Sequence, residues 1–319
     1  MSDPVTVTEA ALLARDQESQ AWQQAFVVML SGELTRRQVM DRVLDRIEYA
    51  PRFRKLVAGW PVPGWVDDQR FAVGGHVREA TLPPGERLEE WLSAKLAKSL
   101  DRAHPLWELT VLHGVAPGMT ALVSRSHPAL VDGYDNVHLL QELFDDVAEP
   151  IPTVADDWRA EPEQPPGLGD VLVGLDDPVR VLRGVGAGLV GMVENAVRTL
   201  SATPRPQYLA GVEVDLDALA PVRDAYGATT HDVLLALATA GVRGWLADNH
   251  RELVDRIALV PLAVAEPAVL ESAIGCRVAP SWIALPVSAT SPADRLRALA
   301  TMTRARIDTG VSVPARDLT

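Results

Sequence analysis

The sequence contains a single cysteine, Cys276, among 319 residues. One thiol excludes an intramolecular disulfide and any metal site built from several cysteines, and it is compatible with a reducing compartment. Basic residues are also scarce, since 30 lysines and arginines stand against 43 aspartates and glutamates, giving a net charge of -13. Because nucleic-acid binding needs a basic surface, we expect no nucleic-acid partner.

Long hydrophobic runs are missing as well. Crossing a bilayer takes about 20 apolar residues, and the nearest candidate, residues 184–193, is about half that length and rich in glycine. Extended to residue 200, it predicts an amphipathic helix that packs on its own protein, with a membrane surface as the alternative. Residues 1–4 lack the basic and then apolar pattern of an export signal. We therefore expect a cytoplasmic protein.

The chain has the composition and length of a globular protein with two domains. Apolar residues make up 47% of it, which is enough for a large core. Helical patterns alternate with short strand candidates, and this alternation predicts an α/β fold. Residues 149–167 are rich in proline and acidic residues and indicate a linker. We place an N-terminal domain at residues 1–148, a linker with a crossover helix at 149–210, and a C-terminal domain at 211–319.

The apolar patterns also predict individual elements. We expect helices at residues 34–49, 88–100, 216–225 and 233–246, and strands at residues 120–125, 212–216 and 259–264. Gly227 is placed to end the third of these helices. The nearly continuous hydrophobicity of the fourth helix predicts that it is buried between layers.

The segment at residues 126–133, Ser-His-Pro-Ala-Leu-Val-Asp-Gly, carries the candidate chemistry. Gly118 supplies a turn before the strand at 120–125, and apolar residues recur at helical spacing after Asp132. This arrangement places His127 on a loop at the end of the strand and Asp132 at the N-cap of the following helix, with Asp135 in its first turn.

An imidazole at this position suits a general base. The unperturbed pKa of histidine is about 6.5, so a neutral His127 can accept a proton from a hydroxyl or a thiol. We expect Asp132 to cap the helix or to pair with an arginine, for which Arg125 and Arg277 are candidates. Gly133 permits close backbone packing. The alternative is a histidine beside a helix cap with no catalytic role.

Three further blocks make the motif more specific. They are Pro-Arg-Phe-Arg-Lys-Leu at residues 51–56, the segment from Trp65 to Val77, and Leu-Asp-Arg-Ala-His-Pro-Leu-Trp-Glu-Leu at residues 100–109. With these blocks the chain resembles the bacterial wax ester synthase/diacylglycerol acyltransferase family over nearly its whole length. The family signature His-His-x-x-x-Asp-Gly aligns its second histidine with His127, its aspartate with Asp132 and its glycine with Gly133. Ser126 stands in place of the first histidine.

The resemblance implies both a fold and a reaction. The fold would be α/β, a two-domain chloramphenicol acetyltransferase-like acyltransferase with mixed sheets and packed helices. His127 would act as the general base that takes the proton of an acceptor hydroxyl, whose oxygen then attacks an acyl-coenzyme A thioester without an acyl-enzyme. Acyl-coenzyme A would be a co-substrate, with no bound cofactor and no metal. The acceptor would be diacylglycerol or a long-chain alcohol, met at the inner membrane face or a lipid-droplet surface.

A second block, residues 227–236, resembles the Asn-Asp-Val-Val-Leu-Ala segment of the family. Asp232 matches the family residue, and His231 stands where the family has asparagine. We expect a structural block in which Thr229 or Thr230 caps a helix, with a second catalytic imidazole at His231 as the alternative. Cys276, in a segment resembling the family's Gly-Asn, is interpreted as a small buried hydrophobe.

Two other functions remain open. Family members continue beyond the point that matches residue 319, so we expect an incomplete second domain, covered by a partner chain or belonging to a non-catalytic lipid- or partner-binding relative. The third possibility is an acyltransferase or condensation module that takes its acyl group from a carrier protein. The enzymatic hypothesis requires one ring nitrogen of His127 to face a channel where an alcohol and a thioester can meet.

Overall fold

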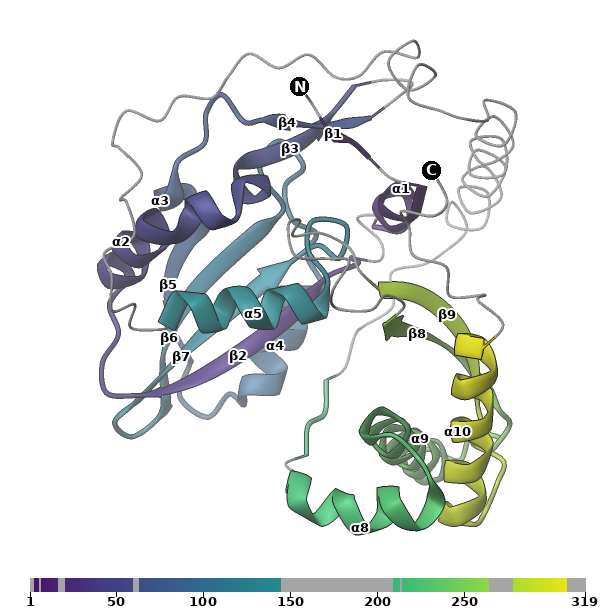
Figure 1. The fold of residues 1–319 in the computed structure, drawn as a ribbon. Helices are drawn as coiled ribbons and strands as arrows, with labels where there is room; N and C mark the ends of the chain where they lie inside the picture. The colour runs from purple at the N-terminus through teal and green to yellow at the C-terminus, as the bar shows by residue number, and fades with distance from the viewer. Residues whose placement is uncertain are drawn as a thin grey trace, which may run out of the picture. The chain divides into compact units, whose positions relative to one another are not determined.

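The computed structural model describes residues 3–5, 7–16, 21–59, 63–144, 209–212, 214–263 and 278–308. The chain divides into two compact units. Unit 1 comprises Met1–Ala210, Leu270–Arg277 and Leu318–Thr319, and unit 2 comprises Gly211–Val269 and Val278–Asp317. Both units mix helices and strands, so the predicted α/β class is confirmed (Figure 1).

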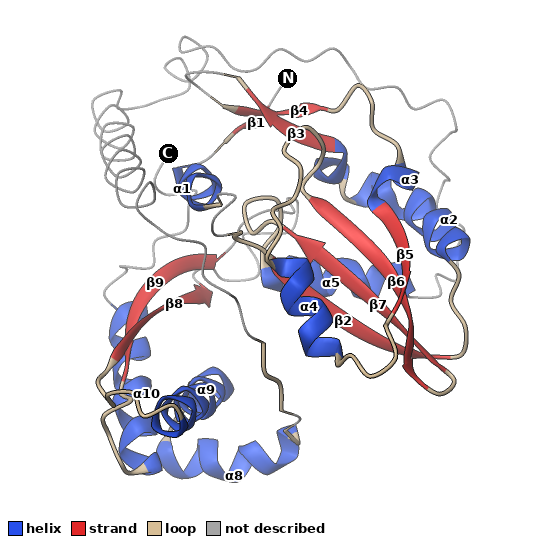
Figure 2. Ribbon diagram, turned by 180° about the vertical axis from the view of Figure 1, so that it is seen from behind, coloured by secondary structure: helices blue, strands red, loops and turns tan. Residues whose placement is uncertain are grey.

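A four-stranded sheet forms the centre of unit 1 (Figure 2). Its strand order is β2 (Gln24–Ser31), β7 (Met119–Ser126), β6 (Trp107–Ala116) and β5 (Val77–Thr81). The pairs β2–β7 and β6–β7 are antiparallel, and β5–β6 is parallel. The strand predicted at residues 120–125 is therefore confirmed. It follows a turn in which Gly118 adopts a positive φ of 68°, a conformation that glycine adopts without steric cost.

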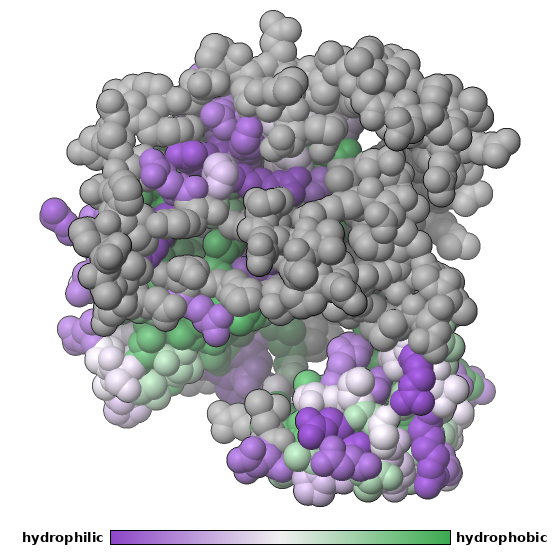
Figure 3. All heavy atoms as spheres, viewed as in Figure 1, coloured by the Kyte–Doolittle hydropathy of each residue, from purple (hydrophilic) through white to green (hydrophobic). Residues whose placement is uncertain are grey.

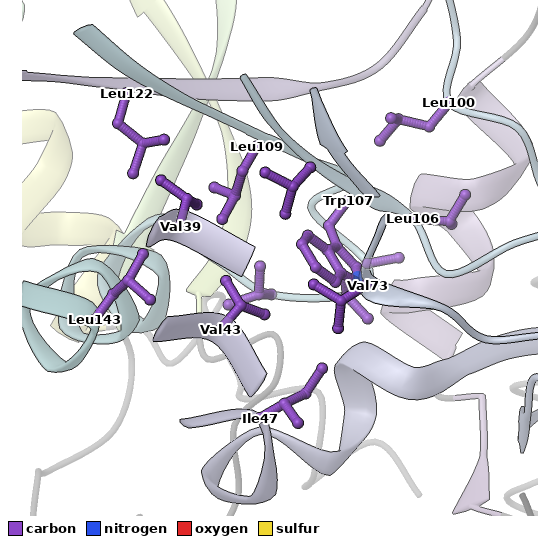
Figure 4. Packing of buried hydrophobic residues seen from close by; sticks show 14 of the residues in the cluster. Val39, Val43, Ile47, Val73, Leu100, Leu106, Trp107, Leu109, Leu122 and Leu143 are labelled. Carbon is purple, nitrogen blue, oxygen red and sulfur yellow. The ribbon is translucent and has the colours of Figure 1, made fainter. Parts of the chain in front are cut away.

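Helices cover both faces of this sheet, as the two-residue period of its strands requires. Alternate residues Leu109, Val111 and Leu122 pack with α2 (Arg36–Arg46) and α5 (Gly133–Phe144), and Figure 4 shows several of these side chains meeting in one core. Their neighbours on the strands pack on the other face with α4 (Leu88–Leu96). The central strand β7 is consequently buried from both sides.

The remaining elements of unit 1 lie at one end of the sheet. They include the helix α1 (Val7–Arg15) and a small antiparallel sheet. The strand order of this sheet is β1 (Asp3–Pro4), β4 (Gly64–Asp67) and β3 (Lys55–Ala58). Short turns complete the unit, namely η1 (Ile47–Tyr49), η2 (Pro51–Arg54) and α3 (Val73–His76). The predicted helices at residues 34–49 and 88–100 are confirmed as α2 with η1, and as α4.

Unit 2 contains three helices and one antiparallel strand pair among its described residues. These elements are α8 (Leu216–Tyr226), α9 (Thr230–Asp248), β8 (Arg256–Ala263), β9 (Val278–Leu285) and α10 (Pro292–Asp308). Gly227 ends α8 in the left-handed conformation, as predicted, and its N–H donates to the carbonyl of Arg223 or Asp224. Figure 3 shows that the described surface of this unit is largely hydrophilic in that view, with scattered apolar side chains.

Two predictions for unit 2 are wrong. The expected strand at residues 212–216 does not form, because Asp215 caps the helix that begins at Leu216, and the described residues before it lie in no strand. The helix α9 is not buried on all sides, since Leu234 and Leu237 are each 43% exposed and Trp245 is 56% exposed. Only one side of α9 packs against the core shared with α8, α10 and the strands.

The linker and crossover helix expected at residues 149–210, with the amphipathic candidate at 184–200, lie outside the described residues except for 209 and 210. In the part of the chain that is described, no helix combines the length and hydrophobicity needed to cross a bilayer.

Replacing Leu122 by alanine should destabilise unit 1 strongly. Leu122 is fully buried in the central strand, so truncation leaves a cavity that costs about 2–5 kcal/mol. Met29→Ala on the neighbouring strand is a matched control, because Met29 is 44% exposed and its truncation should cost about 0.5 kcal/mol. Urea unfolding followed by tryptophan fluorescence measures both. Equal losses for the two variants would contradict the placement of this core.

Candidate active site

His127 directly follows the last residue of β7, as predicted. Its N–H donates to the carbonyl of Leu106 at 3.0 Å, and its own carbonyl accepts from the N–H of Leu130 at 2.9 Å. These two bonds fix the backbone between the end of β7 and the start of α5. The side chain has no exposed surface. The ring is therefore enclosed in this conformation, which contradicts the expectation that one of its nitrogens faces a channel.

One hydrogen bond determines how the ring of His127 carries its proton. The N–H of Ala129 donates to Nδ1 of the ring at 3.0 Å. A backbone N–H can only donate, so Nδ1 is the acceptor and the neutral ring has its proton on Nε2. Nε2 itself is buried and has no hydrogen-bond partner in the described structure. The polar atom facing it is Oδ2 of Asp16, 3.9 Å away.

Burial controls the charge of this ring. Desolvation lowers the pKa of His127 from 6.5 to about 4, although the negative charge of Asp16 acts in the opposite direction. Arg102 adds a smaller lowering effect through its positive charge. At neutral pH the ring is therefore uncharged.

Asp16 is a site residue that the sequence analysis missed. It directly follows α1, and its side chain is only 1% exposed. Its Oδ1 accepts from the N–H of Trp22 at 2.8 Å and from the hydroxyl of Ser99 at 2.9 Å. Its Oδ2 has no hydrogen-bond partner, like the histidine nitrogen that it faces. No spacing in the sequence connects Asp16 with His127, because only the folded chain brings them together.

Asp132 caps α5, which confirms one of its two expected roles. Its Oδ1 accepts from the N–H of Asp135 at 2.9 Å, and its carbonyl accepts from the N–H of Asn136 at 3.0 Å. Gly133 is not required for close packing, since an added Cβ would lie 3.7 Å from Phe26, an ordinary van der Waals distance.

Ser126, which stands in place of the family's first histidine, forms hydrogen bonds with one residue of α5 and one residue of β2. Its hydroxyl accepts from Nδ2 of Asn136 at 2.7 Å and from Nε2 of Gln24 at 3.1 Å. The same Gln24 amide donates to the carbonyl of Val131 at 2.7 Å. Ser126 therefore helps to hold the loop that carries His127.

Arg125 forms its ion pair with Glu108, at 3.7 Å. Its Nη1 also donates to the carbonyl of Lys95 at 2.7 Å, which places the guanidinium on the α4 face of the sheet. The other candidate partner of Asp132, Arg277, lies outside the described residues, as does Cys276.

The second block has the structural role that was predicted. Thr229 is the N-cap of α9, and the side chain of Asp232 completes a capping box by accepting from the N–H of Thr229. Burial would raise the pKa of Asp232, but hydrogen bonds from Thr303 and Thr229 lower it overall. His231 is exposed beside this cap. Among the described residues, no group of three or more histidine, cysteine, aspartate or glutamate side chains could hold a metal.

Comparison with known proteins identifies relatives of this chain. Residues 2–206 match a sequence family described as the wax ester synthase/diacylglycerol acyltransferase catalytic domain. A Mycobacterium tuberculosis protein named as a candidate diacylglycerol O-acyltransferase is 32% identical over 173 residues, covering 50% of this chain and 62% of that protein. A second one from this species is 30% identical over 291 residues, covering 80% of this chain and 56% of that protein. The chain thus spans less than two thirds of the length of these relatives.

Solved structures show that the fold is shared more widely. The wax ester synthase/diacylglycerol acyltransferase from Marinobacter aquaeolei VT8 matches 95% of this chain and 72% of its own, with a TM-score of 0.59 and 20% identity. The first condensation domain of the calcium-dependent antibiotic synthetase matches 100% of this chain and 77% of its own, with a TM-score of 0.56 and 14% identity. At these identities the matches establish the fold, which is the one the family resemblance predicted.

Removing the cap of α5 should cost a measurable amount of stability. Asp132→Ala leaves the N–H of Asp135 without its acceptor, and we expect a loss of about 0.5–2 kcal/mol. Asp132→Asn keeps a side-chain oxygen at the cap and should lose less than half as much. Urea unfolding at neutral pH measures the two variants. Equal losses would show that the carboxylate acts here through its charge rather than as a cap.

The buried ring of His127 should also make stability depend on pH. Its pKa is lowered to about 4 in the folded state, so the unfolded chain binds a proton below pH 6.5 while the folded chain does not. The ring's contribution is complete above pH 6.5 and is lost as the pH falls to 4, by roughly 3 kcal/mol. The unfolding free energy of the wild type minus that of His127→Gln, measured from pH 7 to pH 4, should therefore fall as the pH falls. A constant difference would mean that the ring is not held neutral.

Proposed function

The chain belongs to the wax ester synthase/diacylglycerol acyltransferase family, and on that basis we propose that it is an O-acyltransferase. It would transfer a fatty acyl group from acyl-coenzyme A to the hydroxyl of diacylglycerol or a long-chain alcohol, forming triacylglycerol or a wax ester. The observation that carries the proposal is the position of His127, held at the end of β7 with Nε2 buried and unpartnered. A buried polar atom without a partner is uncommon in native proteins and calls for an explanation, of which a catalytic role is one.

In the proposed reaction His127 is the general base for the acceptor hydroxyl. The hydroxyl oxygen attacks the thioester carbonyl as its proton is removed, and a tetrahedral intermediate then releases the thiolate of coenzyme A. General-base assistance contributes roughly 100- to 10,000-fold to such a step, and the remainder comes from holding the two substrates together. The ring has no exposed surface, and Nε2 carries the proton of the neutral ring in this conformation. Nε2 therefore accepts the hydroxyl proton only when residues around the ring move aside and Nδ1 is released from the N–H of Ala129.

The fold also leaves open a second kind of acyl donor. The condensation-domain match raises the alternative that the acyl group arrives on a carrier protein rather than on free coenzyme A. The two alternatives differ in one observable property, because a carrier-dependent enzyme uses a pantetheine-linked protein in preference to acyl-coenzyme A. A non-catalytic lipid- or partner-binding relative would use neither.

Cytoplasmic location, with the acceptor met at the inner membrane face or a lipid-droplet surface, is part of the same proposal. Its support is chemical, since the acceptors and the ester products are neutral lipids. A partner chain that covers apolar surface of unit 2 is also proposed, with support from the exposed Leu234, Leu237 and Trp245 of α9.

The wild-type chain should form ester from palmitoyl-coenzyme A and either dipalmitoylglycerol or hexadecanol. His127→Ala should lower turnover by about 100-fold or more and leave the protein folded, because it removes the group that activates the hydroxyl. Radiolabelled ester separated by thin-layer chromatography measures turnover, and circular dichroism measures folding. His231→Ala is the control and should keep its activity. A folded His127→Ala variant with wild-type turnover would exclude this site.

A further inference from the structure

Asp16 and His127 lie opposite each other inside unit 1, and each has one polar atom without a hydrogen-bond partner. These atoms are Oδ2 of Asp16 and Nε2 of His127, 3.9 Å apart. The side chains are 1% and 0% exposed, so bulk water does not solvate them. Leaving a buried polar atom unpaired is energetically unfavourable. Two such atoms that face the same space indicate a binding position for a small polar group.

The carboxylate is held firmly in this orientation. Trp22 and Ser99 both donate to Oδ1, which directs the second oxygen toward the histidine. Arg102 holds the backbone at the same point, since its Nη2 donates to the carbonyls of Leu13 and Asp16. The same Nη2 lies 3.7 Å from Oδ2 of Asp16, so Arg102 also pairs electrostatically with the carboxylate. Oδ2 has no hydrogen-bond partner and can still accept from a ligand.

The chemistry of the two atoms defines the group that fits between them. Because Ala129 donates to Nδ1, the neutral ring offers an N–H at Nε2, while the carboxylate of Asp16 offers only an acceptor. The bridging group must accept one hydrogen bond and donate another. A hydroxyl does both, whereas a carbonyl or ether oxygen only accepts and an ammonium group only donates. With Nε2 and Oδ2 3.9 Å apart, an oxygen about 2.8 Å from both atoms would make an Nε2–oxygen–Oδ2 angle of roughly 90°.

We propose that Asp16 is a second catalytic residue, whose Oδ2 binds the acceptor hydroxyl together with Nε2 of His127 and receives its proton. This inference rests on the proposed acyl transfer and refines it, because Oδ2 of Asp16 is then the proton acceptor and the ring of His127 is a hydrogen-bond donor to the hydroxyl oxygen. The N–H at Nε2 holds the hydroxyl oxygen during the attack. The low pKa of His127 is consistent with this division, since the ring is neutral and only weakly basic.

The proton and electron balance of the step is complete with an acyl thioester as the second substrate. The hydroxyl proton passes to Oδ2 of Asp16 as the oxygen forms its bond to the thioester carbon, and the carbonyl electron pair moves to the carbonyl oxygen. When the tetrahedral intermediate collapses, the carbon–sulfur bond breaks and its electron pair leaves with sulfur. The thiolate takes the proton back from Asp16, which restores the carboxylate.

The first test compares two asparagine variants. Asp16→Asn keeps an oxygen for Trp22 and Ser99 but replaces the free acceptor with an amide NH2, so turnover should fall about 100-fold or more. Asp68→Asn is the matched control, because Asp68 is also buried and also contacts an imidazole, that of His104, at 3.3 Å. Its turnover should stay close to that of the wild type. A folded Asp16→Asn variant with wild-type turnover would overturn the proposal.

The second test does not depend on the folding of the Asp16 variant. Glutamine can present an amide N–H near the place of Nε2–H, so His127→Gln should turn over at least about 10-fold faster than His127→Ala if the ring only donates to the hydroxyl. Equal inactivity of the two His127 variants would instead make the ring the sole proton acceptor and overturn the assignment to Asp16.

A binding measurement separates failure of this inference from failure of the proposed function. Calorimetry with decanol requires no acyl donor, and the wild type should bind it more tightly than Asp16→Asn. If the wild type forms no ester but shows this difference, acyl transfer is wrong and the hydroxyl site stands. If it forms ester but both proteins bind decanol equally, the proposed function stands and the hydroxyl site is wrong.

Discussion

The hydrogen bond from Ala129 N–H to Nδ1 of His127 constrains everything else at this site. It places the proton of the neutral ring on Nε2, and it does so with a backbone group that cannot change its role. Nε2 then faces a buried carboxylate oxygen 3.9 Å away, too far for a direct hydrogen bond. The result is a buried donor and a buried acceptor that are held apart, each without a hydrogen-bond partner in the described structure, and a hydroxyl can accept from the one and donate to the other.

The fold supplies the rigidity that this arrangement needs. The central strand β7 is packed on both faces, and six residues separate its end from the start of α5, the last of them being the cap Asp132. The loop that carries His127 is thus fixed at both ends. Asp16 comes from a distant part of the sequence, and hydrogen bonds from Ser99 and Arg102 hold it in place. Loss of any of these supports would change the distance between Oδ2 of Asp16 and Nε2 of His127, on which the proposed hydroxyl site depends.

The sequence was sufficient wherever a local pattern governs the structure. The strand before His127, the cap at Asp132 and the glycine end of α8 follow from spacing and from the chemistry of single residues. It failed where tertiary contacts decide. Residues 212–216 alternate like a strand, but Asp215 instead caps the helix that begins at Leu216. The exposure of α9 depends on which elements pack against it, and its sequence does not specify them. Asp16 could not be found because no local rule links it to a histidine that only folding brings near.

A crystal structure of the protein with a long-chain alcohol tests the central claim most directly. The hydroxyl oxygen should lie within hydrogen-bond distance of both Nε2 of His127 and Oδ2 of Asp16, with the N–H of Ala129 still donating to Nδ1. An alcohol bound with its hydroxyl in contact with neither side chain, in a structure where the two close on each other, would show that the pair is a structural contact and that the acceptor is activated elsewhere.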